Sequence, residues 1–129
     1  MAASPIFIGS VRRETNTISA ANTNRDGTGT LVACFTAGSS GSAIFRIRIK
    51  AQSTTTAGMI RIFNTFNSVT TLIKEIPVSA ITPSATVPTW EGELFFNANE
   101  MMVLPSGTTL RFSTNNAEAF TVNIEGGDY

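Results

Sequence analysis

The chain has 129 residues and a mass of 13.7 kDa, the size of one domain, and nine basic side chains balance nine acidic ones. This neutral balance argues against a protein that binds nucleic acid through phosphate contacts, because such domains carry an excess of Lys and Arg. The chain has no histidine and one cysteine, Cys34, so an intramolecular disulfide, a Cys/His zinc site and a Ser-His or Cys-His dyad are excluded. We therefore expect no enzyme, no cofactor and no metal site.

The composition favours an all-β fold. Thr occurs 19 times, Ser 12 times and Asn 10 times, whereas Leu occurs only 5 times. Residues that are β-branched or aromatic fit a pleated, half-buried surface, and a chain rich in Thr and poor in Leu makes a poor helical bundle. No segment approaches the ~20 continuous apolar residues of a membrane span, so we expect no membrane partner. Cys34 lies in an apolar run, and we interpret it as a small buried hydrophobe.

The first 28 residues differ from the rest of the chain. After Pro5-Ile6-Phe7-Ile8, the stretch from Arg12 to Gly29 is polar, with Ile18 as its only large apolar interruption. A stretch of this kind cannot form a core strand pair alone, so it predicts an extended N-terminal arm or long loop over residues 1–28. Asp26-Gly27 is typical of a tight turn, since glycine readily adopts positive φ. The β-sandwich domain is then expected over residues 29–129.

From residue 30 onward, short apolar or alternating segments follow one another at regular intervals, separated by turn residues. This spacing predicts an antiparallel eight-stranded β-sandwich, with a jelly roll as the favoured form. Strand spacing does not encode strand order, so other eight-stranded sandwiches remain open. Three prolines mark residues 77–88 as irregular, because proline cannot donate to a central ladder. The expected strands are Thr30–Thr36, Ile44–Gln52, Met59–Thr65, Val69–Ile76, Trp90–Phe96, Met101–Leu104, Leu110–Phe112 and Phe120–Ile124.

The most orderly charge feature is the row Arg46, Arg48 and Lys50, which alternates with apolar residues and so lies on one face of one strand. The row is either a docking stripe for an acidic partner or a solvated outer face paired with Glu91 and Glu93, and we favour the second interpretation. The two glutamates also have a spacing that a glycosidase carboxylate pair can use. The chain offers few aromatic platforms for a sugar cleft, so we do not expect catalysis there.

The apolar cluster Pro5, Ile6, Phe7 and Ile8 allows two interpretations. It either returns to the sandwich as an edge strand, or it buries its side chains in a partner by β-augmentation or by arm exchange between subunits. In the second case Arg12 and Arg13 would contact an acidic surface of that partner.

Four segments resemble a recurrent pattern in small virion proteins of tailed bacteriophages and prophages. They are Ala21–Thr30, Arg46–Ala51, Ile76–Ala85 and the ending Glu125–Asp128. The resemblance implies a structural virion protein, above all a capsid decoration (cement) protein on the capsid surface, assembled in the host cytoplasm. It also implies a homotrimer that binds the major capsid protein and stabilises the head lattice. Two alternatives stay open: a tail, baseplate or fibre component, and a glycan-binding β-sandwich module.

Overall fold

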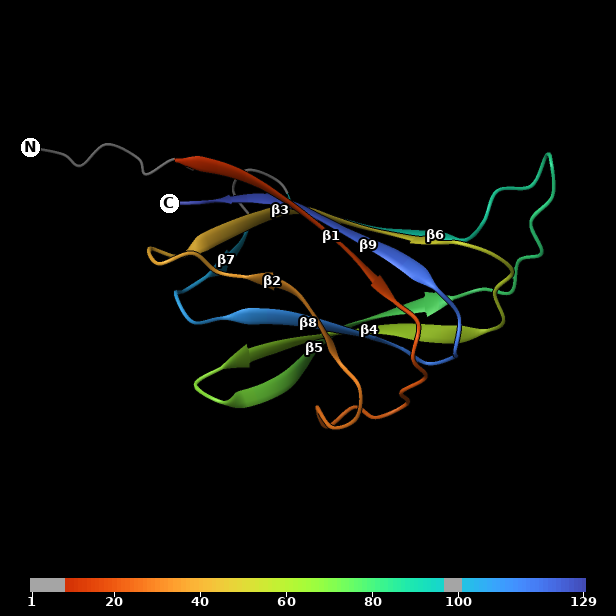
Figure 1. Ribbon diagram of the computed structural model, residues 1–129, viewed down its shortest axis with the longest axis horizontal. Helices are drawn as coiled ribbons and strands as arrows, with labels where there is room; N and C mark the ends of the chain where they lie inside the picture. Colours follow the sequence, from red (N-terminus) through yellow and green to blue (C-terminus); the bar gives the residue numbers. More distant parts are fainter. Residues whose placement is uncertain (1–8, 97–100) are drawn as a thin grey trace, which may run out of the picture.

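Two antiparallel sheets pack face to face in the computed structural model, which describes residues 9–96 and 101–129 (Figure 1). This part of the chain contains nine strands and no helix, hence no helix that could cross a membrane. The predicted all-β sandwich is therefore confirmed, with one strand more than the eight expected. The strands are β1 (Ser10–Ile18), β2 (Val32–Thr36), β3 (Ser42–Ala51), β4 (Gly58–Phe66), β5 (Val69–Val78), β6 (Glu91–Phe95), β7 (Met102–Leu104), β8 (Thr109–Thr114) and β9 (Phe120–Asp128).

Most connections pass from one sheet to the other. Sheet A has the order β1-β9-β3-β6, and β7 pairs with the same edge of β3 as β6 does. Sheet B has the order β2-β8-β4-β5. Among the nine described strands, only β4 and β5, and β6 and β7, are consecutive in the chain and lie in the same sheet. Strand β1 lies beside β9, so the first and last described strands are neighbours in space. The jelly-roll form of the sandwich stays a prediction.

The core lies between the sheets and is built by alternate residues of the central strands. The buried Trp90 packs edge-on against Phe120, with ring centroids 5.8 Å apart. Cys34 is buried as well, as predicted. Such edge-to-face pairs and tight aliphatic packing hold the two layers together. Fully buried members include Ile47 and Ile49 of β3, Ile60 and Ile62 of β4, Leu110 and Phe112 of β8, and Val122 and Ile124 of β9.

The expected N-terminal arm is wrong for Ser10–Ile18, which form the edge strand β1 of sheet A. This strand pairs with β9 along its whole length, from Ser10 opposite Asp128 to Ile18 opposite Phe120. Exposure alternates along β1 with period two, as in any half-buried strand. The inward residues before Ile18 are Arg12, Glu14 and Asn16, so polar side chains occupy the inward face of the strand as well as most of its outward face. Hydropathy alone could not reveal this strand.

The loop after β1 lies against the outer face of sheet B. The backbone N–H of Asn22 donates to the Thr114 carbonyl at 2.8 Å, and the buried Asn22 side chain donates to the carbonyls of Thr28 and Thr30. Gly27 has a φ of 87°, which confirms the turn expected at Asp26-Gly27. Residues 19–31 are therefore a folded loop of the sandwich.

Candidate functional site

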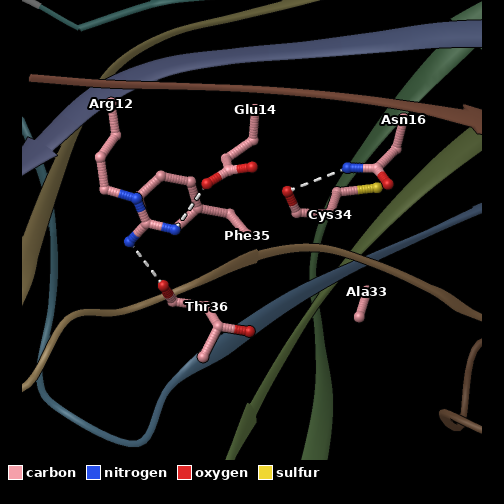
Figure 2. A pocket seen from close by; sticks show the side chains of 7 residues that line it. All are labelled: Arg12, Glu14, Asn16, Ala33, Cys34, Phe35 and Thr36. Carbon is pink, nitrogen blue, oxygen red and sulfur yellow. Dashed lines mark hydrogen bonds and ion pairs between the residues drawn. The ribbon is translucent and has the colours of Figure 1, made fainter.

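A polar groove separates the edge strands β1 and β2, where the two sheets approach each other along one side of the sandwich. Its volume is about 250 Å³. The sequence brings these strands together because β1 completes sheet A beside β9, while β2 completes sheet B beside β8. Figure 2 shows the lining side chains: Arg12, Glu14 and Asn16 from β1, and Ala33, Cys34, Phe35 and Thr36 from β2.

Side chains of β1 occupy the free edge of β2. The guanidinium of Arg12 donates through Nη1 to the carbonyl of Thr36 at 2.7 Å, and Asn16 Nδ2 donates to the carbonyl of Cys34 at 3.3 Å (Figure 2). Unpaired strand edges invite a further strand, and proteins commonly block them with polar or charged side chains. Here the two donors satisfy carbonyls that a neighbouring strand would otherwise bind.

Arg12 is the centre of the groove. Its guanidinium lies 4.1 Å from the centroid of the Phe35 ring, a cation–π contact, and it pairs with Glu14 at 2.8 Å and Asp128 at 3.0 Å. Burial by itself would lower the pKa of Arg12, but the hydrogen bonds and charges of Glu14 and Asp128 outweigh it and raise that pKa. The arginine is therefore permanently charged and links β1, β2 and β9.

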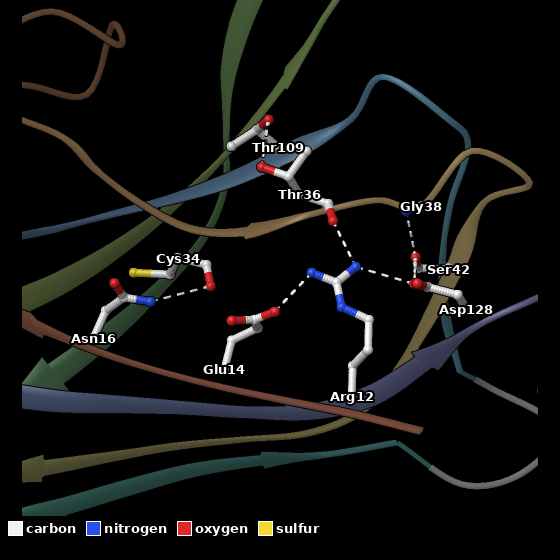
Figure 3. Close-up of polar contacts among 9 residues, drawn as sticks. All are labelled: Arg12, Glu14, Asn16, Cys34, Thr36, Gly38, Ser42, Thr109 and Asp128. Atoms are coloured by element: carbon white, nitrogen blue, oxygen red, sulfur yellow. Dashed lines mark hydrogen bonds and ion pairs between the residues drawn. The ribbon is translucent and has the colours of Figure 1, made fainter. Parts of the chain in front are cut away.

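Asp128 continues this network toward the β2–β3 turn. Its Oδ1 accepts a hydrogen bond from Ser42 Oγ at 2.6 Å, and Ser42 Oγ accepts one from the backbone N–H of Gly38 at 2.9 Å (Figure 3). The hydrogen bond from Ser42, and then that from Arg12, hold the pKa of Asp128 below its ordinary value. The network thus connects both sheets and the turn between them.

The groove holds no group suited to nucleophilic or acid–base chemistry. Burial raises the pKa of the Cys34 thiol to about 12, and the thiol donates to the Val32 carbonyl, so almost no thiolate exists near neutral pH. Glu14 is occupied by its ion pair with Arg12. Within residues 9–96 and 101–129, no group of three His, Cys, Asp or Glu side chains could hold a metal ion. The groove is thus a structural contact that joins β1, β2 and β9.

The cationic row Arg46, Arg48 and Lys50 lies on the outer face of sheet A. Strand β3 pairs with β6 in a register that sets Arg48 opposite Glu93 and Lys50 opposite Glu91, the neighbour relation that we favoured. Arg46 lies 3.6 Å from Glu93, while Lys50 donates to the carbonyl of Thr89 at 3.0 Å. These contacts within the chain explain the arrangement of the three cationic side chains without a binding partner. A docking role for the row stays a prediction.

The remaining candidate residues separate in space. Arg13 lies opposite Glu125 in the β1–β9 register and donates to Asn123 Oδ1 at 3.2 Å, so it shares the outer face with the cationic row. Arg48 also reaches Glu125, at 3.6 Å. Arg12, one position earlier, faces the groove instead. Residues 5–8, namely Pro5, Ile6, Phe7 and Ile8, lie outside the described residues.

One polar cluster was not predicted from the sequence. Arg61 of β4 is only 3% exposed, and its guanidinium bonds to Glu75 at 3.1 Å, to Asn115 at 3.1 Å and to the Asn22 carbonyl. Arg25 binds the same Glu75 oxygen at 2.8 Å, and this hydrogen bond is the chief reason that the pKa of Glu75 is lowered. The cluster fastens the loop after β1 to sheet B. In the sequence, Arg61 between Ile60 and Ile62 is indistinguishable from a solvated arginine.

No protein family model and no curated protein matches the chain. Among solved structures, a chain of the cyanophage Pam1 capsid asymmetric unit matches all of this chain and 92% of its own length, with a TM-score of 0.50 and 11% sequence identity. At this identity the likeness shows a shared fold. The protein therefore has a fold that also occurs in a phage capsid, in a chain of nearly the same length.

Proposed function

We propose that this protein is a structural component of a phage virion, and more specifically a decoration protein that binds the capsid surface and stabilises the head lattice. The observation that carries the proposal is the fold match over the full length of the chain to a component of a cyanophage capsid. The resemblance of four sequence segments to small phage virion proteins points in the same direction.

The polar clusters support a structural role. The groove around Arg12 and the cluster around Arg61 both join layers of the fold, and their charges are satisfied by neighbouring groups. A sandwich without net charge suits a protein that is held by other proteins. Weak contacts repeated on a lattice bind firmly through avidity, and a homotrimer bound to the major capsid protein would multiply such contacts.

The test is the stoichiometry of this chain in purified particles from its source, measured by quantitative mass spectrometry against the major capsid protein. A decoration protein gives a molar ratio of about one, or of about one-third if one trimer stands on each group of nine capsid subunits. A ratio of about one hundredth or less, on the order of one trimer against several hundred capsid subunits, moves the protein to the tail or baseplate. Absence from washed particles refutes a virion role, and binding to polysaccharide in a pull-down would then favour the glycan-binding alternative.

A further inference from the structure

The connection between β5 and β6 is longer than its path requires. Besides residues 19–31, which join β1 to β2 and fold onto sheet B, three connections pass between the sheets at this end of the sandwich: residues 52–57 between β3 and β4, residues 115–119 between β8 and β9, and residues 79–90 between β5 and β6. Packed sheets lie about 10 Å apart, a distance that three or four extended residues can span. The first two connections use six and five residues, whereas the third uses twelve. Figure 1 shows this third loop projecting beyond the sheets.

Both stems of the projecting loop are fixed to the sandwich. The buried Thr55 exchanges backbone hydrogen bonds with Ile81, at 2.9 and 3.2 Å, and its hydroxyl donates to the Ser79 carbonyl at 2.8 Å. On the other stem, Lys50 donates to the Thr89 carbonyl at 3.0 Å. Lys50 of the cationic row thus supports the loop.

The tip of the loop, residues 84–87, is held in one conformation. Ser84 and Val87 exchange backbone hydrogen bonds at 3.0 and 3.3 Å, and the Ser84 hydroxyl accepts from the N–H groups of Thr86 and Val87. Pro83 and Pro88 flank the tip and fix their own φ angles. A loop that is ordered before it binds loses less conformational entropy on binding than a mobile one. Long loops with such order are commonly functional.

The chemistry of the loop defines what it can recognise. Residues 79–90 contain no charged side chain, and the consecutive residues 84–88 are all exposed, with Val87 at 43%. Ala85, Val87 and Pro88 offer apolar groups beside the hydroxyls of Ser84 and Thr86. A surface without charge has no attraction for nucleic acid or for a strongly charged protein face. The aromatic ring of this segment, Trp90, is buried, so the loop lacks the exposed ring that commonly stacks on a sugar.

We infer that residues 79–89 form a preformed finger whose tip inserts Val87 into an uncharged, apolar hollow on the protein shell of the head. This inference rests on the proposed function, since it names the surface by which the decoration protein contacts the lattice. Burial of Val87 supplies the apolar contact, and the hydroxyl and backbone groups around it bind polar groups at the rim of the hollow.

The experiment compares three forms of the protein for binding to particles from which the protein has been removed by gene deletion. Val87→Asp places a carboxylate in the hollow, and we expect affinity in co-sedimentation to fall by about tenfold or more, because an unpaired charge is costly to bury. The matched control is Val69→Asp, at a valine 60% exposed on the β4–β5 hairpin at the opposite end of the sandwich. Both variants should keep the melting temperature of the wild-type protein, because both valines are exposed.

The outcomes separate the inference from the proposed function. If the wild type and Val87→Asp bind the particles equally, or if Val69→Asp weakens binding as much as Val87→Asp does, the finger is not the contact. Replacement of residues 83–87 by two glycines gives a second variant of the finger, which must also lose binding while it retains the wild-type circular dichroism spectrum. If the wild type itself does not bind the particles, the proposed function fails and the inference falls with it.

Discussion

Two adjacent arginines on β1 allow a direct test of the groove between β1 and β2. Arg12 points into the groove, where it bonds to the Thr36 carbonyl and stacks on Phe35, whereas Arg13 points outward to an exposed contact with Asn123. Arg12→Met keeps most of the aliphatic stem and removes the guanidinium. Arg13→Met makes the same chemical change on the opposite face of the same strand, so it is a matched control.

The expected effect follows from the contacts that are lost. A hydrogen bond to a carbonyl contributes about 1–1.5 kcal/mol, and a partly exposed cation–π contact adds about 0.5–1 kcal/mol. The ion pairs of Arg12 are partly exposed and add little. We therefore expect Arg12→Met to lower the free energy of unfolding by about 2 kcal/mol, or the melting temperature by roughly 5–10 °C. Arg13→Met should change the free energy of unfolding by less than about 0.5 kcal/mol.

Urea denaturation followed by tryptophan fluorescence measures both variants, because Trp90 is buried in the core. Equal stability of the two variants would refute the reasoning, since it would mean that β1 contributes to the sandwich only through its backbone. A large loss in both variants would equally contradict the assignment of Arg13 to the outer face.

Three further predictions concern single residues. The hydrogen bond from Ser42 lowers the folded-state pKa of Asp128, so this carboxylate stabilises the fold fully above its ordinary pKa of 3.8, and its contribution disappears as the pH falls through the lowered value. The free energy of unfolding of the wild type should therefore decline below about pH 4, and that of Asp128→Asn should decline less. A wild-type free energy of unfolding that does not change with pH in this range would contradict the prediction. Cys34, with a pKa of about 12, should react with a thiol reagent at least about a hundredfold more slowly in the folded protein than in 8 M urea, where its rate should be that of an ordinary thiol. Rapid labelling of the native state would show that the groove opens. Gly126→Ala should lower the free energy of unfolding by more than about 2 kcal/mol, because the added Cβ would overlap the carbonyl of Ala43. A melting temperature equal to that of the wild type would argue against this close approach.

The strands that bury apolar side chains were predictable. Every expected strand from residue 30 onward occurs, and most boundaries agree within two residues. The largest difference is at the end of β9, where Gly126 and Gly127 resemble a tail but continue the strand opposite Arg12 and Val11. A glycine is needed at 126 because a bulge in β3 brings the backbone of Ala43 close. Close backbone approach leaves no trace in hydropathy.

The polar parts of the fold were not predictable in the same way. Strand β1 escapes detection because Arg12, Glu14 and Asn16 face inward and are satisfied by groups that lie far away in sequence, such as the Cys34 carbonyl and Asp128. Polar residues on a buried face have the same composition as polar residues in a loop. Their role depends on which strands become neighbours, and strand order is a property of the whole fold.

The pairing of β1 with β9 also determines how the molecule responds to mechanical load. The start of β1 and the end of β9 lie side by side at one end of sheet A, with Ser10 opposite Asp128 (Figure 1). A force that pulls Ser10 and Asp128 apart acts perpendicular to the strands, so the hydrogen bonds between β1 and β9 break one pair at a time, from Ser10–Asp128 toward Ile18–Phe120. A load that enters through the loops at opposite ends of the sandwich instead stretches both sheets along their strands, so that many hydrogen bonds must break at once. In the role proposed above, on a pressurised shell, the protein would therefore hold best if its loops, rather than the paired ends of β1 and β9, carried the tension.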